Sequence, residues 1–275
     1  MQSAIGDWQL AMIMITSHDN SLLRRARAVR DGKVAEAIFI EGLRLCEEAL
    51  RSGLPIEAVI FSEEIAHKDK AARLIKELSP VCNRLASVSE KLLASISYTK
   101  TPQGLVLLAA RPAMDEASFK STQPASPLLV VLHGINNPVN VGAILRTAEA
   151  AGASGAITTQ GTSDPFSPKA LRGAMGSAFR LPIWTGATYA AVLSWCAERR
   201  IETVCADVEG ETAYTALDWT TPTALVMGSE STGLTAEEAS AATRVVAISM
   251  RGKVESLNVG VAAAILLYEA ARQRT

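Results

Sequence analysis

Short apolar runs alternate with helical patterns through the second half of this 275-residue chain. The runs are continuous rather than alternating with polar residues, which is typical of strands buried on both faces of a parallel sheet. We expect strands at residues 128–132, 156–159, 203–206, 224–227 and 245–249, and helices at 141–151, 189–199, 235–242 and 257–272. This order predicts an α/β domain whose mostly parallel sheet is covered by helices on both faces.

A similar alternation in the first half predicts a second, smaller α/β domain. The expected strands lie at residues 37–40, 58–61 and 104–110, and the expected helices at 42–52 and 70–78. Residues 111–127 carry three prolines and mostly small or polar residues, as linkers do. We therefore predict one domain at residues 13–110, a linker at 111–127 and a second domain at 128–275, which a chain of this length accommodates.

Composition indicates a folded protein of a reducing compartment. Apolar residues make up 48% of the chain and charged residues 20%, which is enough for a globular core. The longest apolar-rich runs, such as residues 261–267, are too short to cross a bilayer, and the N-terminus has no secretory pattern. We expect a cytoplasmic protein without a membrane partner. The four cysteines form no C-x-x-C pair and the three histidines are scattered, so we expect buried thiols and no metal site.

Basic residues cluster near the N-terminus although the formal net charge is only −1. Binding of nucleic acid depends on where charges sit more than on their sum. If residues 21–30 form a helix, their positive side chains cover one broad face. Such a face suits RNA contact or a solvated helix surface equally well. The cluster consists of Arg24, Arg25, Arg27, Arg30 and Lys33.

Three polar, glycine-containing loops follow expected strands of the second domain. Asn140 follows the first strand and opens a helix, Gly228 follows the strand at residues 224–227, and residues 250–256 lead into the last helix. Ligands of parallel α/β sheets usually bind beyond the carboxyl ends of the strands. The three loops are therefore predicted to line one pocket.

The second of these loops nearly matches a phosphate-binding loop. Residues 228–235 read G-S-E-S-T-G-L-T, but Leu234 stands where the lysine is required and Glu230 would repel phosphates. No G-x-G-x-x-G is present either, so a nucleotide triphosphatase or a Rossmann dinucleotide site is disfavoured. A glutamate here suits a positively charged cofactor. Its alternative role is that of a carboxylate at the N-terminus of the helix that begins near Thr235.

Together and in this order, the three loops resemble the signature motifs of the SpoU (TrmH) family of RNA methyltransferases. The family's first motif, N-x-G-x-x-x-R-T-A, is matched by Asn140, Gly142, Arg146, Thr147 and Ala148. Its second motif is matched by Gly228, Glu230 and Gly233, and its third by Ile248, Met250, Gly252, Ser256, Leu257 and Asn258. A further family segment is similar to residues 169–177 around Arg172, where Gly173 and Ala174 depart mildly from the usual R-A-S.

The first domain also resembles the substrate-binding module of this family, a small α/β fold akin to some ribosomal proteins. Residues 39–49, F-I-E-G-L-R-L-C-E-E-A, and 101–104, T-P-Q-G, are similar to its characteristic segments. Residues 15–20 resemble its start, with Ser21 where a proline is often found. The resemblance therefore covers nearly the whole chain.

The resemblance implies transfer of a methyl group from S-adenosylmethionine to a ribose 2′-hydroxyl of RNA. It implies a SPOUT α/β domain with a trefoil knot at the C-terminal end, which periodicity alone does not reveal. It also implies a homodimer in which the arginine of one subunit lies near the cofactor of the other. The cofactor would be held in a bent form, largely by backbone groups, at Met227, Gly228, Ile248, Met250, Leu257 and Asn258.

Catalytic roles are expected for Asn140, Arg146, Glu230, Ser256 and Asn258. A guanidinium resists deprotonation in proteins, so we interpret Arg146 as a bidentate anchor for an RNA phosphate and a stabiliser of negative charge on oxygen. Asn140 would orient the ribose or Arg146, and Glu230 would hold the arginine or the basic loop. Ser256 and Asn258 would bond to the nucleotide and to the carboxylate end of the cofactor. Helix capping is the alternative role for Asn140, Ser256 and Asn258.

Ribosomal RNA is the expected substrate, with Arg172 and the arginines of residues 24–30 as RNA contacts. Transfer RNA is the nearest alternative, because recognition of folded RNA depends on shape and splayed bases that one sequence does not reveal. A catalytically silent RNA-binding relative is a third interpretation. The complete set of polar motif residues argues against a catalytically silent protein. A titration with S-adenosylmethionine distinguishes an active enzyme from a silent relative.

Overall fold

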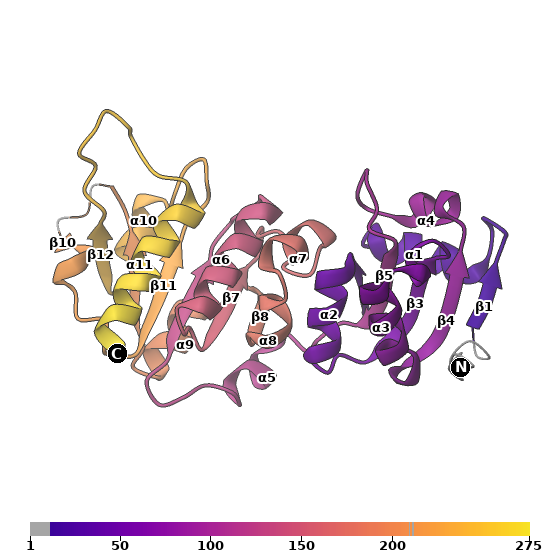
Figure 1. The fold of residues 1–275 in the computed structure, drawn as a ribbon. Coiled ribbons are helices and arrows are strands. Elements are labelled where there is room, and N and C mark those ends of the chain that lie inside the picture. The colour runs from indigo at the N-terminus through magenta and orange to yellow at the C-terminus, as the bar shows by residue number, and fades with distance from the viewer. Residues whose placement is uncertain (1–11, 209, 211) are drawn as a thin grey trace. The chain divides into compact units, whose positions relative to one another are not determined.

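The computed structural model describes residues 12–208, 210 and 212–275 (Figure 1). The chain divides into two compact units. The first comprises the described residues up to Pro112 together with Phe166–Phe179, and the second comprises Ala113–Pro165 and Arg180–Thr275. Each unit has its own sheet, and the mixed α/β architecture with two domains is as predicted.

The sheet of the first unit has the strand order β1-β4-β3-β5-β2. Strands β1, β4 and β3 are parallel, and β5 runs antiparallel to both β3 and β2. The strands are β1 (Met12–Ile15), β2 (Ala37–Glu41), β3 (Ile56–Ser62), β4 (Cys82–Val88) and β5 (Leu105–Ala110). The α-helices are α1 (Ser21–Arg30), α2 (Leu43–Arg51), α3 (Asp69–Leu78), α4 (Glu90–Ile96) and α7 (Pro168–Ala174), with short 3-10 turns at Ile65–His67 and Ser79–Val81.

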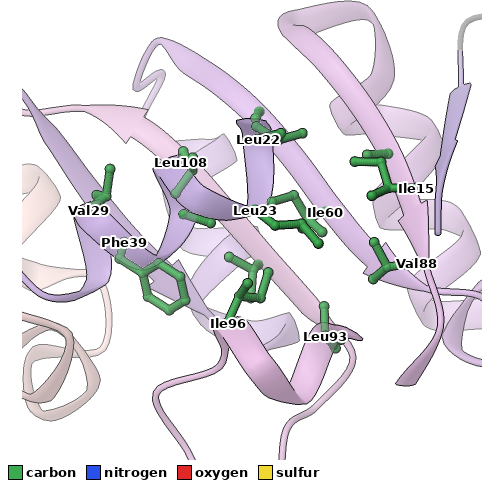
Figure 2. Close-up of a cluster of buried hydrophobic side chains, with 14 of the residues drawn as sticks. Ile15, Leu22, Leu23, Val29, Phe39, Ile60, Val88, Leu93, Ile96 and Leu108 are labelled. Atoms are coloured by element: carbon green, nitrogen blue, oxygen red, sulfur yellow. The ribbon is translucent and has the colours of Figure 1, made fainter. Parts of the chain in front are cut away.

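Helices cover both faces of this first sheet. Leu23 of α1 and Ile96 of α4 pack against Phe39, Ile60 and neighbouring strand residues in one buried cluster (Figure 2). Alternate strand residues point to opposite faces, so Ile40 belongs to the other face, where α2 contacts β2 and β5 and packs against α3. The predicted strands and helices of this half are confirmed.

The sheet of the second unit has the order β10-β12-β9-β11-β6-β7-β8, and every pair of neighbouring strands is parallel. The strands are β6 (Leu128–Leu132), β7 (Gly155–Thr159), β8 (Ile183–Ala187), β9 (Glu202–Ala206), β10 (Thr212–Ala213), β11 (Thr223–Met227) and β12 (Arg244–Ala247). The helices are α5 (Glu116–Lys120), α6 (Pro138–Ala150), α9 (Tyr189–Glu198), α10 (Ala236–Ser240) and α11 (Val259–Arg274), with a 3-10 turn at Tyr214–Ala216; α8 (Ser177–Arg180) spans the boundary between the units.

Both faces of the second sheet are covered, as the continuous apolar strands predicted. Phe119 of α5 and Trp195 of α9 lie in the core on one face, and Ala239 of α10 and Ala242 just after it pack against this core. Helices α6 and α11 pack against each other and contact β7 and β11. The five predicted strands and four predicted helices are all present.

Several elements were missed in the sequence. Strand β4 begins with the polar and exposed Asn83 and Arg84, which hide the apolar pattern of its second half. Helix α5 lies inside residues 111–127, the predicted linker, where its few residues and the surrounding prolines gave no periodic signal. Strands β1, β8 and β10 and helices α4, α7 and α8 were not anticipated either.

The cysteines of the chain are unpaired thiols, and three of them are buried. Burial raises the pKa of Cys196 to about 12 and that of Cys205 to about 11, so both stay protonated at neutral pH. They pack in the core of the second unit as small hydrophobic residues. Over the described residues, the helices are too short or too polar to span a bilayer.

Phe119→Ala tests whether α5 is anchored to the second sheet. The side chain is 2% exposed, and its ring centroid lies 6.3 Å from that of Trp184 and 5.7 Å from that of Trp195. The truncation opens a cavity in the core, so we expect the free energy of unfolding to fall by about 3–5 kcal/mol in urea denaturation. Lys120 on the same helix is exposed, so Lys120→Ala should change the free energy of unfolding by less than about 0.5 kcal/mol. A loss below about 1 kcal/mol for Phe119→Ala would contradict the anchoring.

Candidate functional site

A pocket of about 730 Å³ lies at the carboxyl ends of the second sheet, within the range of small-ligand sites. Loop 228–234, which connects β11 to α10, forms one wall of it. The loop after β12, the end of β9 and the N-terminal turns of α6 and α11 complete the lining. The lining residues are Asn136, Asn137, Asn140, Ala206, Asp207, Val208, Met227, residues 228–234, Ile248, Met250, Ser256, Leu257, Asn258, Val259 and Ala262.

The three loops predicted to share a pocket do meet here. The lining includes Asn140 of the first motif, Met227, Gly228 and Glu230 around the second, and Ile248, Met250, Ser256, Leu257 and Asn258 of the third. Among the expected catalytic residues, Arg146 alone is outside the lining as described. The roles assigned to these residues stay predictions.

A chain of side-chain hydrogen bonds links the three motifs. Asn258 Nδ2 donates to Asn140 Oδ1 at 3.3 Å, and Asn140 Nδ2 donates to Glu230 Oε1 at 3.0 Å. Asn140 is 9% exposed, so its amide is withdrawn from bulk water and depends on these two partners. Because an amide donates from one end and accepts at the other, both contacts together define its orientation.

Glu230 lies at the N-terminus of α6. The alternative prediction, that it acts as the carboxylate at the N-terminus of α10, is therefore not the role seen in the structure. Its carboxylate accepts hydrogen bonds from the backbone amides of Asn136, at 3.3 Å, and Asn137, at 3.2 Å. Burial acts to raise the pKa of Glu230, but the hydrogen bonds from Asn140 and the backbone amides outweigh it and lower the pKa below its usual value. The N-terminal carboxylate of α10 is Glu238, which forms a capping box with Thr235.

The helix caps resolve the alternative roles of the asparagines. Asn137 is the N-cap of α6 and accepts from Val139 N at 3.0 Å, so Asn140 is not the cap. Asn258 is the N-cap of α11 and accepts from the amides of Gly260, at 2.9 Å, and Val261, at 3.4 Å. Its side chain therefore both starts α11 and contacts Asn140. Helix α11 begins at Val259, later than predicted, for this reason.

Arg146 is exposed near the C-terminal end of α6, about two turns from Asn140. It has no ion pair with the described residues of its own chain, and the contact expected between Glu230 and the arginine is not formed there. Val139 lies seven residues earlier on the same stripe of α6 and is 44% exposed. Arg146 therefore faces solvent beside an apolar residue in the single chain.

The expected RNA contacts of the first unit differ in their surroundings. Arg25 donates to Glu57, Arg27 donates to the His18 carbonyl at 2.9 Å, and Arg30 donates to Asp31 and to two carbonyls at the end of α4. Arg24 and Arg172 are exposed, and neither forms an ion pair with another described residue. These two keep their full capacity to bind phosphate.

Several pocket residues were missed in the sequence. Asn136 and Asn137 precede Pro138, and an asparagine before a proline at the first helical position is a helix-start signal that identifies them. Ala206, Asp207 and Val208 follow β9, and the rule that ligands bind beyond strand ends would have included them.

The lining suits S-adenosylmethionine. Leu234, Ile248, Leu257 and Ala262 supply apolar surface for an adenosyl group, and the Glu230 carboxylate supplies a negative charge at the same pocket. Across the described chain, no group of three or more histidine, cysteine, aspartate or glutamate side chains is arranged to hold a metal ion.

Comparison with known proteins agrees with this geometry. Residues 127–268 match the SpoU rRNA Methylase family, and residues 20–107 match the MRM3-like substrate binding domain. A tRNA/rRNA methyltransferase of Synechocystis is 32% identical over 263 residues, which cover 94% of both chains. The chain belongs to the SpoU rRNA methylase family.

Two further relatives carry more specific names. The 23S rRNA 2′-O-methyltransferase of Streptomyces viridochromogenes is 29% identical over 245 residues, which cover 87% of this chain and 84% of the relative. The AdoMet-bound rRNA methyltransferase of Sinorhizobium meliloti superimposes with a TM-score of 0.80 at 28% identity, covering 95% of this chain and 98% of the other. The predictions of an RNA methyltransferase and of S-adenosylmethionine as its cofactor are confirmed.

Glu230→Gln tests the charge at the N-terminus of α6. Because the folded pKa of Glu230 lies below its usual value near 4.5, the carboxylate stabilises the folded chain above that value, and this contribution is lost as the pH falls through the folded pKa. We expect the variant to unfold with a free energy lower by about 0.3–1 kcal/mol at about pH 7 in urea denaturation, and the difference to disappear as the pH falls through the folded pKa of Glu230. If the difference in the free energy of unfolding did not vary with pH, a stabilising charge of Glu230 at the N-terminus of α6 would be contradicted.

Proposed function

We propose that this chain methylates a ribose 2′-hydroxyl of ribosomal RNA, and that the pocket bounded by loop 228–234 binds its cofactor. The observation that carries the proposal is the hydrogen-bonded chain Asn258–Asn140–Glu230, which joins the three motifs around one pocket. The name of the Streptomyces relative, a 23S rRNA 2′-O-methyltransferase, supports the choice of ribose and of ribosomal RNA.

The residues proposed to hold the cofactor lie on three sides of the pocket. Met227 and Gly228 end β11, Ile248 and Met250 follow β12, and Leu257 and Asn258 precede α11. S-adenosylmethionine supplies an electrophilic methyl group on a sulfonium centre. Glu230 contributes negative charge beside that cation, and its low pKa keeps it ionised at neutral pH.

The proposed reaction depends on positioning the ribose oxygen for in-line attack. Asn140 is held by Glu230 and Asn258, so its amide is a preorganised element of the site. Ser256, in the loop before α11, is exposed and available to the nucleotide. Because guanidinium groups resist deprotonation in proteins, we assign Arg146 to binding the RNA phosphate and stabilising charge on the attacking oxygen, and not to the role of base.

In a homodimer, Arg146 of one subunit would lie at the cofactor pocket of the partner subunit. On α6, Arg146 and Val139 share a stripe, and on the adjacent α11, Val261 and Tyr268 also share one and are 49% and 55% exposed. Exposed apolar residues on two packed helices suit burial against a second copy of the same surface. We therefore propose that α6 and α11 form the dimer interface and that Arg146 serves the partner's cofactor.

A trefoil knot is proposed for the second unit. The chain leaves β12 near one edge of the sheet, passes the pocket wall formed by loop 228–234, and ends in α11 against α6. The return of the chain from β12 to α11 can be followed in Figure 1, and the threading itself is proposed from the resemblance to the family. We also propose a cytoplasmic location, because the Streptomyces relative is named for ribosomal RNA. Transfer RNA is the second candidate substrate, since the Synechocystis relative is named for both RNA classes.

The function is tested by mapping 2′-O-methyl groups in total RNA from a deletion strain. One ribosomal RNA position should lose its methyl group and regain it on complementation with the wild-type gene. Loss at a transfer RNA position would change the substrate class. No loss at any position in either RNA class would reject the proposed activity.

Arg146→Lys keeps the positive charge but loses the planar pair of donors. We expect methylation of RNA from the deletion strain to slow about a hundredfold, because an interaction made in the transition state is lost. The affinity for S-adenosylmethionine, measured by calorimetry, should stay unchanged, since Arg146 does not line the pocket of its own chain. Near-normal methylation at neutral pH would reject the anchor role.

Mixed dimers extend this test to the partner subunit. Arg146→Lys retains a complete pocket, and Asn258→Ala retains Arg146, so a heterodimer of the two contains one complete composite site. Co-purified heterodimers should methylate faster than either variant homodimer. Equal, low activity in all three would place Arg146 at the pocket of its own chain.

Arg24→Ala and Arg25→Ala form a matched pair for RNA binding. Arg24 is exposed, whereas Arg25 is held by Glu57 and Glu36. Removing a phosphate contact should weaken RNA binding several-fold and reduce the slope of log affinity against log salt by about one. We expect this for Arg24→Ala only, in filter-binding titrations at increasing salt. If Arg25→Ala weakened RNA binding as much as Arg24→Ala, the proposal that only the exposed Arg24 contacts phosphate would be contradicted.

A further inference from the structure

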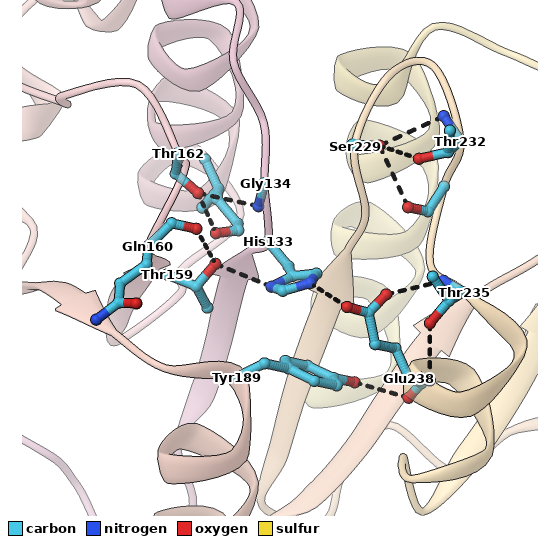
Figure 3. Close-up of polar contacts among 12 residues, drawn as sticks. His133, Gly134, Thr159, Gln160, Thr162, Tyr189, Ser229, Thr232, Thr235 and Glu238 are labelled. Carbon is cyan, nitrogen blue, oxygen red and sulfur yellow. Dashed lines mark hydrogen bonds and ion pairs between the residues drawn. The ribbon is translucent and has the colours of Figure 1, made fainter.

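A polar cluster lies beside the pocket without lining it (Figure 3). Its members are His133 after β6, Thr159 at the end of β7, Tyr189 at the start of α9 and Glu238 in α10. None of them belongs to a motif that the family resemblance singles out. The cluster joins four elements of the second unit at the carboxyl edge of its sheet.

The His133 ring is held at both nitrogens and on one face. Nδ1 lies 2.9 Å from Thr159 Oγ1, and Nε2 lies 2.9 Å from Glu238 Oε1. The Tyr189 ring lies against it with centroids 4.5 Å apart, and the Tyr189 hydroxyl donates to the Glu238 carbonyl at 3.1 Å. Nε2–H can donate to Glu238, whereas the Thr159 hydroxyl also donates to the Gln160 carbonyl at 3.4 Å, so the direction of the Nδ1 contact depends on the tautomer of the ring.

Glu238 connects this ring to the start of α10. Its second oxygen, Oε2, accepts from Thr235 N at 2.8 Å, and its own amide donates to Thr235 Oγ1 at 3.2 Å. The Thr235 amide lowers the pKa of Glu238, and the His133 bond lowers it further against the opposing effect of burial. Helix α10 has five residues and none of them is fully buried, so it is held in position by the packing of Ala239 together with such polar contacts.

Loop 228–234, immediately before Thr235, closes tightly on itself. Gly233 N donates to Ser229 O at 3.0 Å, and the hydroxyls of Ser229 and Thr232 lie 2.8 Å apart (Figure 3). A Cβ at Gly228 would come within 2.6 Å of the Gly233 carbonyl carbon, so the two ends of the loop are in direct contact. Such a loop moves as one piece, and its attachments to the rest of the unit determine where it lies.

Two carboxylates tie this loop and the start of α10 to residues 133–140, in addition to the packing of Leu234 against the apolar core. Glu230 bonds to Asn136, Asn137 and Asn140 inside the pocket, and Glu238 bonds to His133 outside it. We propose that His133 is a positioning residue for cofactor binding: through Glu238 it places the wall formed by loop 228–234. The inference rests on the proposed function, in which S-adenosylmethionine occupies this pocket.

His133→Phe in the full-length chain tests the inference. Phenylalanine keeps a ring against Tyr189 but loses both hydrogen bonds and leaves Glu238 Oε1 without this partner. Calorimetric titration with S-adenosylmethionine should show a Kd about tenfold higher than in the wild type. Hydrogen exchange of the peptide over residues 229–235 should quicken to a similar degree, with no cofactor present.

Glu238→Gln is the conservative variant, which keeps the contacts of Glu238 without its charge, and Asp115→Ala is the control variant. Glutamine preserves the capping box, and His133 can donate from Nδ1 to Thr159 and accept at Nε2, so Kd should change less than about threefold. Asp115 caps α5 with bonds to Ser118 N and Oγ, at 2.9 and 2.8 Å, and is not a pocket residue. Its loss should lower the melting temperature without changing Kd.

The outcomes separate this inference from the proposed function. If His133→Phe binds the cofactor within twofold of the wild type and exchanges at the same rate, the positioning role is wrong. If Asp115→Ala weakens binding equally, the effect is general destabilisation and the role is again rejected. Should His133→Phe not fold, Tyr189→Phe, which removes only the bond to the Glu238 carbonyl, must still weaken binding two- to threefold, or the inference fails. A wild-type chain that binds no S-adenosylmethionine would reject the pocket assignment itself.

Discussion

The hydrogen bonds of the Asn140 amide are the interaction on which the rest of the site depends. One amide accepts from Asn258, which starts α11, and donates to Glu230, which lies at the start of α6. Removing either end would leave a buried polar group without a partner, at a cost of about 1–3 kcal/mol. Three loops that are distant in sequence are thereby held in one arrangement around the pocket.

The parallel sheet makes this arrangement possible. Strand β11 lies between β6 and β9, so the loop that follows it is flanked by the segments that follow its two neighbours. All carboxyl ends lie at the same edge, and so the polar residues after each strand converge there. Loop 228–234 gains two attachments in this way, one inside the pocket through Glu230 and one outside it through Glu238.

Prediction from the sequence succeeded where a pattern is local. The apolar run at residues 128–132 and the polar motif around Asn140 can be recognised without a structure. Buried strands and helix starts each require particular residue types at neighbouring positions. It failed where the decisive partner is distant in sequence. Glu230 was assigned an alternative role at the nearby α10, but its bonds go to residues that are 90 to 94 positions away. The His133 cluster combines single residues from four elements and carries no motif at all.

The sequence by itself determined the α/β class and many of its strands and helices, and the resemblance of its motifs to a known family indicated the family, the enzyme class and the cofactor. Those properties follow from periodicity and from short motifs, which neighbouring residues specify together. Only the tertiary structure decided which residues touch: that Asn258 meets Asn140, that Glu230 serves α6, and that Arg146 faces away from the pocket of its own chain. The physical reason is that a hydrogen bond depends on the distance and direction between two atoms, and packing of the whole sheet and its helices sets both.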